Sequence, residues 1–142
     1  MPQMIFVNLP VKDLAASKAF YEAIGAVNEP KFTNDDAACM VISDTIFVML
    51  LTHPFFKGFT SKAIPDAHET CQVLLCISRD SREAVDEITE QAIAAGGRET
   101  RPAQDMGMMY SRSFEDPDGH VWEPMWMDPA AAEQGASAFE DA

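Results

Sequence analysis

The sequence has few basic residues for its acidic content. Ten Lys and Arg stand against 23 Asp and Glu, which gives a formal net charge of −13 at pH 7. Contact with a phosphate backbone depends on Lys and Arg side chains that displace counterions, so this balance argues against nucleic acid as a partner. An anionic membrane surface is disfavoured for the same reason.

Long hydrophobic runs and a targeting signal are also lacking. No apolar stretch approaches the roughly 20 residues that a membrane-spanning helix needs. The first ten residues have neither a basic start nor an A-x-A cleavage pattern. These absences predict a cytoplasmic protein with no membrane partner.

Cysteine is scarce. The three cysteines, Cys39, Cys71 and Cys76, are odd in number and show no C-x-x-C spacing. This excludes a disulfide framework and a zinc knuckle, and it favours reduced thiols in the cytoplasm. A nucleophilic cysteine would need an adjacent base, and the sequence places none beside these residues.

What the chain does contain is a repeated order of elements. Hydrophobic periodicity and turn residues predict strands and helices in the same order twice. The first set is a strand at 4–9, a helix at 14–24 capped by Asp13, and strands at 31–33, 37–42 and 45–51. The second set is a strand at 70–78, a helix at 81–95 with Asp80 and Glu83 at its start, and strands at 98–104, 108–114 and 120–127.

This repetition predicts an α+β fold built from two tandem β-α-β-β-β modules. The first module covers about 4–52, a linker covers 53–69, the second module covers about 70–127, and an acidic, Ala-rich tail covers 128–142. A length of 142 residues is that of one domain with a real core, so we expect residues 1–142 to form a single domain.

Two motifs lie in the two halves. The first half reads V-x-D-L-x-x-S-x-x-F-Y from Val11 to Tyr21, and the second reads F-x-D-P-D-G-H-x-x-E from Phe114 to Glu123. With these motifs the chain resembles the vicinal oxygen chelate superfamily, which includes glyoxalase I, bleomycin-resistance proteins, fosfomycin-resistance thiol transferases and extradiol dioxygenases. It is most similar to small bacterial proteins described as predicted lactoylglutathione lyases. The resemblance implies a cup-shaped mixed β-sheet with helices outside and a ligand inside, and it favours a homodimer.

The resemblance also implies where a metal site would lie. Metal-dependent members hold one divalent ion with a residue from the first and the last strand of each module. The corresponding positions here are Phe6, Met49, Val73 and Glu123. Only Glu123 offers an oxygen ligand, and the thioether of Met49 suits only copper(I). The aligned positions therefore do not form the family's metal site, and no cofactor is expected.

A displaced divalent metal site is the alternative. It would use His53, His68 and Glu123. Both histidines lie on the predicted linker, which is a poor place for preorganised ligands. The simpler interpretation is that both face solvent.

Strand alternation predicts which side chains line the cup. These are Phe6, Asn8, Met49, Leu51, Val73, Met109, Ser111, Ser113 and Met125. The other face of the second module should carry Tyr110, Arg112, Trp122 and Trp126, with Arg112 paired to Asp86 or Glu90. Ordinary core packing is the alternative explanation for the apolar members of the first set.

Glu123 is the one carboxylate on the predicted apolar face of its strand. Burial of such a group is costly unless a metal, a cation or hydrogen-bond donors satisfy it. We expect the protein to bind a small, largely apolar molecule without a metal. The alternatives are a metal-dependent glyoxalase-type lyase or extradiol dioxygenase with displaced ligands, and a metal-free isomerase or lyase that uses Glu123 as its catalytic general base. The sequence leaves open whether the protein is an enzyme.

Overall fold

The computed structural model describes residues 2–135 and divides into two compact units. Within the described residues, the first unit is 2–71 together with the short segment Asp116–His120, and the second is Gln72–Glu115 with 121–135. Both units combine a mixed sheet with helices, so the predicted α+β class and tandem modules are confirmed. No helix among residues 2–135 is long and apolar enough to cross a membrane.

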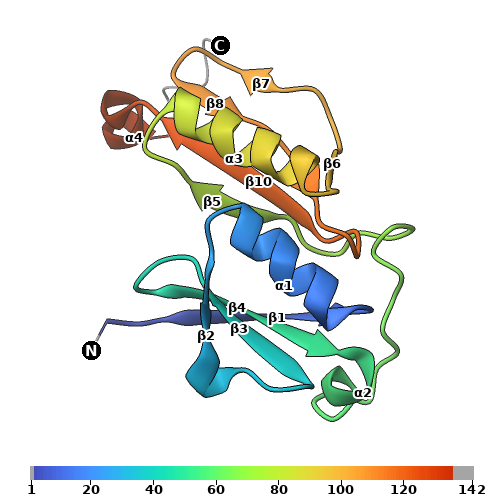
Figure 1. Cartoon of the computed structure of the whole chain (residues 1–142). Helices are drawn as coiled ribbons and strands as arrows, with labels where there is room; N and C mark the ends of the chain where they lie inside the picture. Colours follow the sequence, from blue (N-terminus) through green and yellow to red (C-terminus); the bar gives the residue numbers. More distant parts are fainter. Residues whose placement is uncertain (1, 136–142) are drawn as a thin grey trace. The chain divides into compact units, whose positions relative to one another are not determined.

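The first unit is a four-stranded sheet in the order β1-β4-β3-β2. Figure 1 shows helix α1 lying across one face of this sheet. The elements are β1 (Ile5–Val11), α1 (Leu14–Ala23), β2 (Val27–Glu29), the 3-10 helix η1 (Pro30–Phe32), β3 (Ala37–Val41), β4 (Ile46–Thr52) and α2 (His53–Phe56). Strand β1 runs parallel to β4, whereas β3 runs antiparallel to both β4 and β2.

The core of the first unit lies between α1 and the sheet. Five of its side chains are at most 2% exposed: Phe20 and Tyr21 of α1, and Val11, Val48 and Leu50 of the strands. Complete burial of one such apolar side chain contributes about 1.5–3 kcal/mol. Alternation along the strands therefore assigns one sheet face to the core and leaves the other face open.

The turn from the second motif completes the first unit. Asp116 is 1% exposed, and its carboxylate accepts hydrogen bonds from the Tyr21 hydroxyl at 2.6 Å and from the backbone N–H groups of Asp118 and His120 at 2.9 Å. Burial raises the pKa of Asp116, although the charge of His120 and the hydrogen bond from Tyr21 oppose that rise. The two sequence motifs therefore meet physically through Tyr21 and Asp116.

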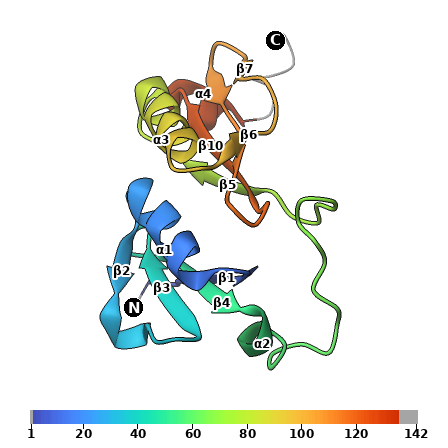
Figure 2. The ribbon, with the colours of Figure 1, turned by 45° about the vertical axis from the view of Figure 1, so that its right-hand side comes forward.

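Gly119 lets the chain pass closely through this turn. It has φ +91°, and a Cβ atom at this position would lie 2.7 Å from both the Ala67 carbonyl carbon and the His68 backbone nitrogen. The Nε2 atom of His68 lies 3.1 Å from the Pro117 carbonyl oxygen. Residues 67–68 of the linker are thus packed directly on the turn, along the extended connection that is drawn in green in Figure 2.

The second unit is a sheet covered on one face by helix α3. The elements are β5 (Leu75–Ser78), α3 (Arg82–Ala94), β6 (Arg98–Glu99), β7 (Gln104–Asp105), β8 (Met109–Ser111), β9 (Phe114–Glu115), β10 (Val121–Met127) and α4 (Pro129–Gln134). Strand β10 is central: β5 pairs with it in parallel on one side, and β8 and β9 pair with it antiparallel on the other. Trp122 and Pro124 of β10 are buried on the α3 face.

Strands β8 and β9 are two parts of one predicted strand. They share one register against β10, and the gap lies opposite Pro124, whose carbonyl accepts a hydrogen bond from the Arg112 N–H at 3.2 Å. Proline has no N–H to return the second bond, so the ladder is interrupted there without a bulge.

Four local predictions were wrong. The strand expected at 98–104 is divided into the two-residue strands β6 and β7. The segment 31–33 is not a strand, because Pro30 begins a 3-10 turn in which the Lys31 N–H donates to the Glu29 side chain. The helix α3 is capped by Ser81, which accepts a hydrogen bond from Ala84, and not by Asp80. The strand expected at 70–78 begins only at Leu75, and Thr70 belongs instead to a turn in which Glu69 and Thr70 donate to the Asp66 carbonyl.

The predicted tail at 128–142 is partly helical. Asp128 caps the short helix α4 by accepting a hydrogen bond from Ala130. The part of the prediction that concerns residues 136–142 lies outside the described residues.

Candidate ligand-binding site

The open face of the first sheet carries an apolar groove. The groove has a volume of about 690 Å³ and is lined by Met4, Phe6, Asn8, Glu29, Lys31, Phe32, Cys39, Val41, Phe47 and Met49. We call this set of residues the apolar groove. Its volume lies within the usual range for cavities that bind small molecules.

Aromatic side chains dominate one wall of the groove. The rings of Phe6 and Phe47 stack with centroids 4.7 Å apart and planes 12° apart. Phe6 is 49% exposed and Phe32 is 66% exposed, which leaves their faces available for contact. Exposed aromatic surface of this kind is normally covered by a ligand or a partner.

Strand pairing explains why these side chains gather. Phe6 lies opposite Phe47 and Asn8 lies opposite Met49 in the parallel pair β1–β4, so all four point to the same face. Asn8 is the polar member of this group and adds an amide that can orient a ligand. The predicted positions Phe6, Asn8 and Met49 therefore line one groove.

Other predicted lining residues lie elsewhere. Leu51 is buried and borders a smaller cavity of about 230 Å³, together with Asn8, Phe56, Phe59 and Thr60. Val73 is 59% exposed and precedes β5, so it does not sit on a strand face at all.

The side chains at the family's metal positions do not fit a divalent ion. Phe6 and Val73 have no donor atom, and Met49 offers only a thioether. Glu123, the remaining position, is already engaged by a side-chain cation: its Oε2 atom accepts a hydrogen bond from Arg101 at 2.9 Å. Among residues 2–135, no three His, Cys, Asp or Glu side chains form a group that could hold a metal ion.

Arg101 is a residue that the sequence analysis missed. Its guanidinium also donates to the Ser111 hydroxyl at 3.3 Å and to the Pro102 carbonyl at 3.2 Å. The side chains of Arg101 and Glu123 are 26% and 19% exposed. A carboxylate on an apolar strand face indicates that Glu123 needs a cationic partner, but the sequence alone does not identify Arg101 as that partner.

The second sheet also has an open face, on the side opposite α3. Pairing in register places Glu123 beside Cys76 of β5, and Met125 opposite Ser111 of β8. The predicted residues Met109, Ser111, Ser113 and Met125 all follow this alternation. Met109 and Met125 are half-buried, whereas Ser111 and Ser113 are buried.

The helix-covered face matches the prediction for Arg112. Its guanidinium donates to Glu99 at 2.8 Å, to Asp86 at 3.1 Å and to Glu90 at 2.8 Å. These hydrogen bonds raise the pKa of Arg112 further, with the bond to Glu99 as the largest cause. The prediction that Arg112 pairs with Asp86 or Glu90 of α3 is confirmed, with Glu99 as a third partner.

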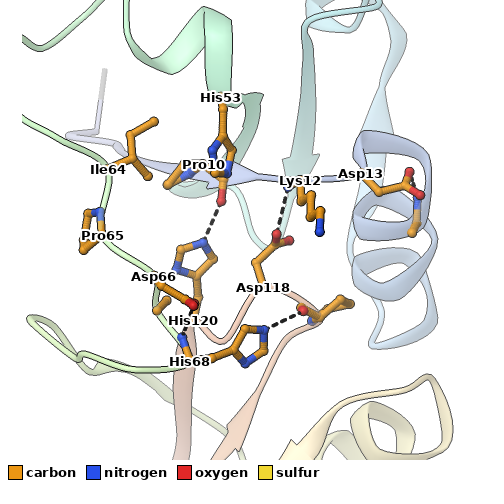
Figure 3. Close-up of a pocket in the computed structure, with 13 residues that line it drawn as sticks. Pro10, Lys12, Asp13, His53, Ile64, Pro65, Asp66, His68, Asp118 and His120 are labelled. Carbon is orange, nitrogen blue, oxygen red and sulfur yellow. Dashed lines mark hydrogen bonds between the residues drawn. The ribbon is translucent and has the colours of Figure 1, made fainter.

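All three histidines border a second cavity of the first unit, with a volume of about 490 Å³ (Figure 3). His120 bonds the Pro10 carbonyl through Nε2 at 2.8 Å, and the Lys12 N–H donates to Asp118 at 2.8 Å. His53 and His68 line the same cavity, whereas Glu123 belongs to the second unit. The residues of the displaced metal site thus lie in two different units, and His68 and His120 hold the turn.

The three cysteines differ in their exposure to solvent. Cys39 is buried, and Cys71 and Cys76 are exposed. Burial raises the pKa of the Cys76 thiol, and the neighbouring charge of Glu123 raises it further while Arg101 lowers it. A raised pKa reduces the thiolate fraction at neutral pH, so the surroundings of Cys76 do not activate it as a nucleophile.

Family models match both halves of the chain. Residues 3–43 match the model described as bleomycin resistance protein-like N-terminal, and residues 60–123 match the glyoxalase/bleomycin resistance protein/dioxygenase superfamily. Together the two matches span most of the sequence. The chain belongs to the glyoxalase/bleomycin resistance protein/dioxygenase superfamily.

Solved structures of this superfamily share the fold. A family enzyme from Burkholderia phytofirmans is 20% identical, with a TM-score of 0.72 over 89% of this chain and 99% of that one. The fosfomycin resistance protein FosX from Mesorhizobium loti is 17% identical, with a TM-score of 0.67 over 92% and 96%. The bleomycin resistance determinant encoded on transposon Tn5 is 18% identical, with a TM-score of 0.63 over 89% and 99%. No curated protein matches the chain significantly.

Proposed function

We propose that this member of the superfamily binds a small, largely apolar molecule in the apolar groove, without a divalent metal at the family's positions. The observation that carries the proposal is the stacked pair Phe6–Phe47 on an open sheet face, beside Met49 and the single amide of Asn8. Apolar pockets with few polar groups are typical of small-molecule sites. A methionine in the wall adapts to ligands of different shapes.

Binding of N-phenyl-1-naphthylamine, a neutral fluorescent probe, tests the groove. Phe6→Ala should weaken binding about tenfold, since loss of one aromatic contact is worth about 1.5 kcal/mol. Ile5→Ala is the matched control: Ile5 is the neighbouring residue of β1, is 56% exposed and does not line the groove. Equal affinities for the wild-type protein and Phe6→Ala would contradict the proposal.

Metal content tests the second half of the proposal. Protein purified without chelator should hold far less than one equivalent of zinc, nickel, manganese or iron, because three of the four family positions offer no suitable ligand. About one tightly held equivalent that disappears in Glu123→Ala would instead support a metal-dependent lyase or dioxygenase.

The cellular setting and the assembly state complete the proposal. Three cysteines, an odd number without C-x-x-C spacing, suit a reducing compartment, so we infer a cytoplasmic protein. We also propose a homodimer, supported by exposed apolar side chains such as Val27, Val73 and Leu74, which are 57–66% exposed. Light scattering coupled to size-exclusion chromatography should give twice the mass of one chain.

A further inference from the structure

Arg101, Ser111 and Glu123 form a hydrogen-bonded group on the open face of the second sheet, which we call the polar centre. Arg101 reaches this group because the edge strand is irregular. Strand β6 pairs with β9, and β7 pairs with β8, but the two pairings differ in register by two residues. The three residues Arg101–Ala103 therefore lie opposite the single residue Arg112. Such bulges redirect a side chain, and they occur often beside functional sites.

The bulge brings the Arg101 side chain to the face that carries Glu123 and Ser111. Both charged groups are about three-quarters or more buried, yet both keep some exposure to solvent. A guanidinium has five N–H donors, and the contacts of Arg101 to described residues use three of them. Two donors remain for a bound molecule.

The surroundings favour an amphipathic ligand. Met125, opposite Ser111, and Met109, two residues from Ser111, lie on the same face, and the exposed Cys76 lies beside Glu123. In such a partly apolar setting, a hydrogen bond from a cation to an oxyanion is stronger than in water. The chain as a whole carries a charge of −13, so an anion would be held here by local contacts and not by the overall field.

We propose that Arg101, oriented by Glu123 and Ser111, binds an oxyanion group of a small apolar molecule, such as a carboxylate or a sulfonate. A guanidinium then stands beside the carboxylate at which metal-dependent relatives hold their ion. This inference goes beyond the proposed function, which concerns the apolar groove of the first unit: it adds a second site, on the open face of the second sheet, and the chemistry of its ligand.

A pair of related probes tests the proposal. 8-Anilinonaphthalene-1-sulfonate and N-phenyl-1-naphthylamine share one aromatic framework, and only the first carries a sulfonate. Arg101→Gln should weaken binding of the sulfonate probe by at least about tenfold and leave the neutral probe within about twofold. Arg98→Gln is the matched control, because Arg98 lies on the same edge strand with a side chain that is 74% exposed.

Glu123→Gln gives an effect of opposite sign. Removal of the competing carboxylate should strengthen binding of the sulfonate probe about threefold or more, because Arg101 then keeps its full charge for the ligand. If the ion pair had only a structural role, Arg101→Gln and Glu123→Gln should each weaken the binding of both probes equally.

The outcomes separate the two proposals. Unchanged affinity for the sulfonate probe in Arg101→Gln, or no binding of it by the wild-type protein, overturns the oxyanion site. Failure of the neutral probe to bind the wild-type protein overturns the apolar groove instead.

Discussion

All five lysines of the chain lie in the first unit, and all five arginines lie in the second. The first unit is held by apolar packing against α1 and by buried hydrogen bonds to its turn. In the second unit, Arg82, Arg98, Arg101 and Arg112 each form an ion pair. A guanidinium is planar and bridges several acceptors at once, whereas an ammonium acts as a point charge.

The two open faces differ in the same way. One presents a stacked aromatic pair, and the other presents the ion pair of Arg101 and Glu123. Two modules with the same order of elements have therefore come to rely on different interactions. Both units have an apolar core, but perturbations of charge should act mainly on the second.

The largest effect is expected at the turn of the first unit. Gly119→Ala should lower the free energy of unfolding by about 3 kcal/mol or more, since the new Cβ combines a strained φ with a clash at 2.7 Å against backbone atoms. Gly96→Ala is the matched control: its φ is +101°, but no atom lies within 4 Å, so only about 1 kcal/mol of strain is expected. Urea denaturation measures both, and equal losses would show that the contact with the linker is unimportant.

A smaller effect is expected at the arginine that ties the second sheet to its helix. Arg112→Lys should lower the free energy of unfolding by about 1–2 kcal/mol, because an ammonium cannot serve Glu99, Asp86 and Glu90 together. Arg98→Lys, at an arginine whose side chain is 74% exposed and, among residues 2–135, pairs with Glu115 alone, should cost less, about 0.5 kcal/mol. In 1 M NaCl the difference between the two variants should shrink. A difference that is independent of salt would point to lost packing.

The smallest effect is a contrast in acid. The hydrogen bond from Arg82 lowers the pKa of Asp105 to about 2, so the stability from this pair is present above pH 4 and is lost as the pH falls toward 2. Burial raises the pKa of Asp116, so its contribution has the opposite sign: it favours folding at low pH and is lost as the pH rises through the raised pKa.

The measurement is the free energy of unfolding between pH 5 and pH 2. Compared with the wild-type protein, Asp105→Asn should lose less stability on acidification, and Asp116→Asn should lose more. Parallel curves for the two variants would refute the assignment of opposite signs.

Much of the fold could be predicted from the sequence because its signals are local. Periodicity located both long helices, and alternation placed Phe6 and Met49 on one open face of their strands. Alternation also placed Arg112 toward α3. Each of these predictions needs only a regular element, and the strands β1, β4 and β10 are regular.

The polar centre of the second sheet could not be predicted in the same way. Alternation assumes a regular strand at 98–104, and on such a strand it gives no reason to select Arg101. In the structure, the two extra residues of the bulge change the face that the Arg101 side chain reaches. Likewise, Tyr21 and Asp116 are far apart in the sequence, and no local rule predicts that one hydroxyl and one carboxylate meet in a core.

The placement of the turn Asp116–His120 has a consequence for inheritance. The first module looks like one half of a duplication, yet its core is finished by a segment encoded within the other half. A recombination event at the linker would separate Tyr21 from Asp116. The first module would then lose the turn that completes its core, and the turn would lose its tyrosine partner. Exchange of modules between relatives should therefore succeed only where the incoming second half brings a turn that the resident tyrosine accepts.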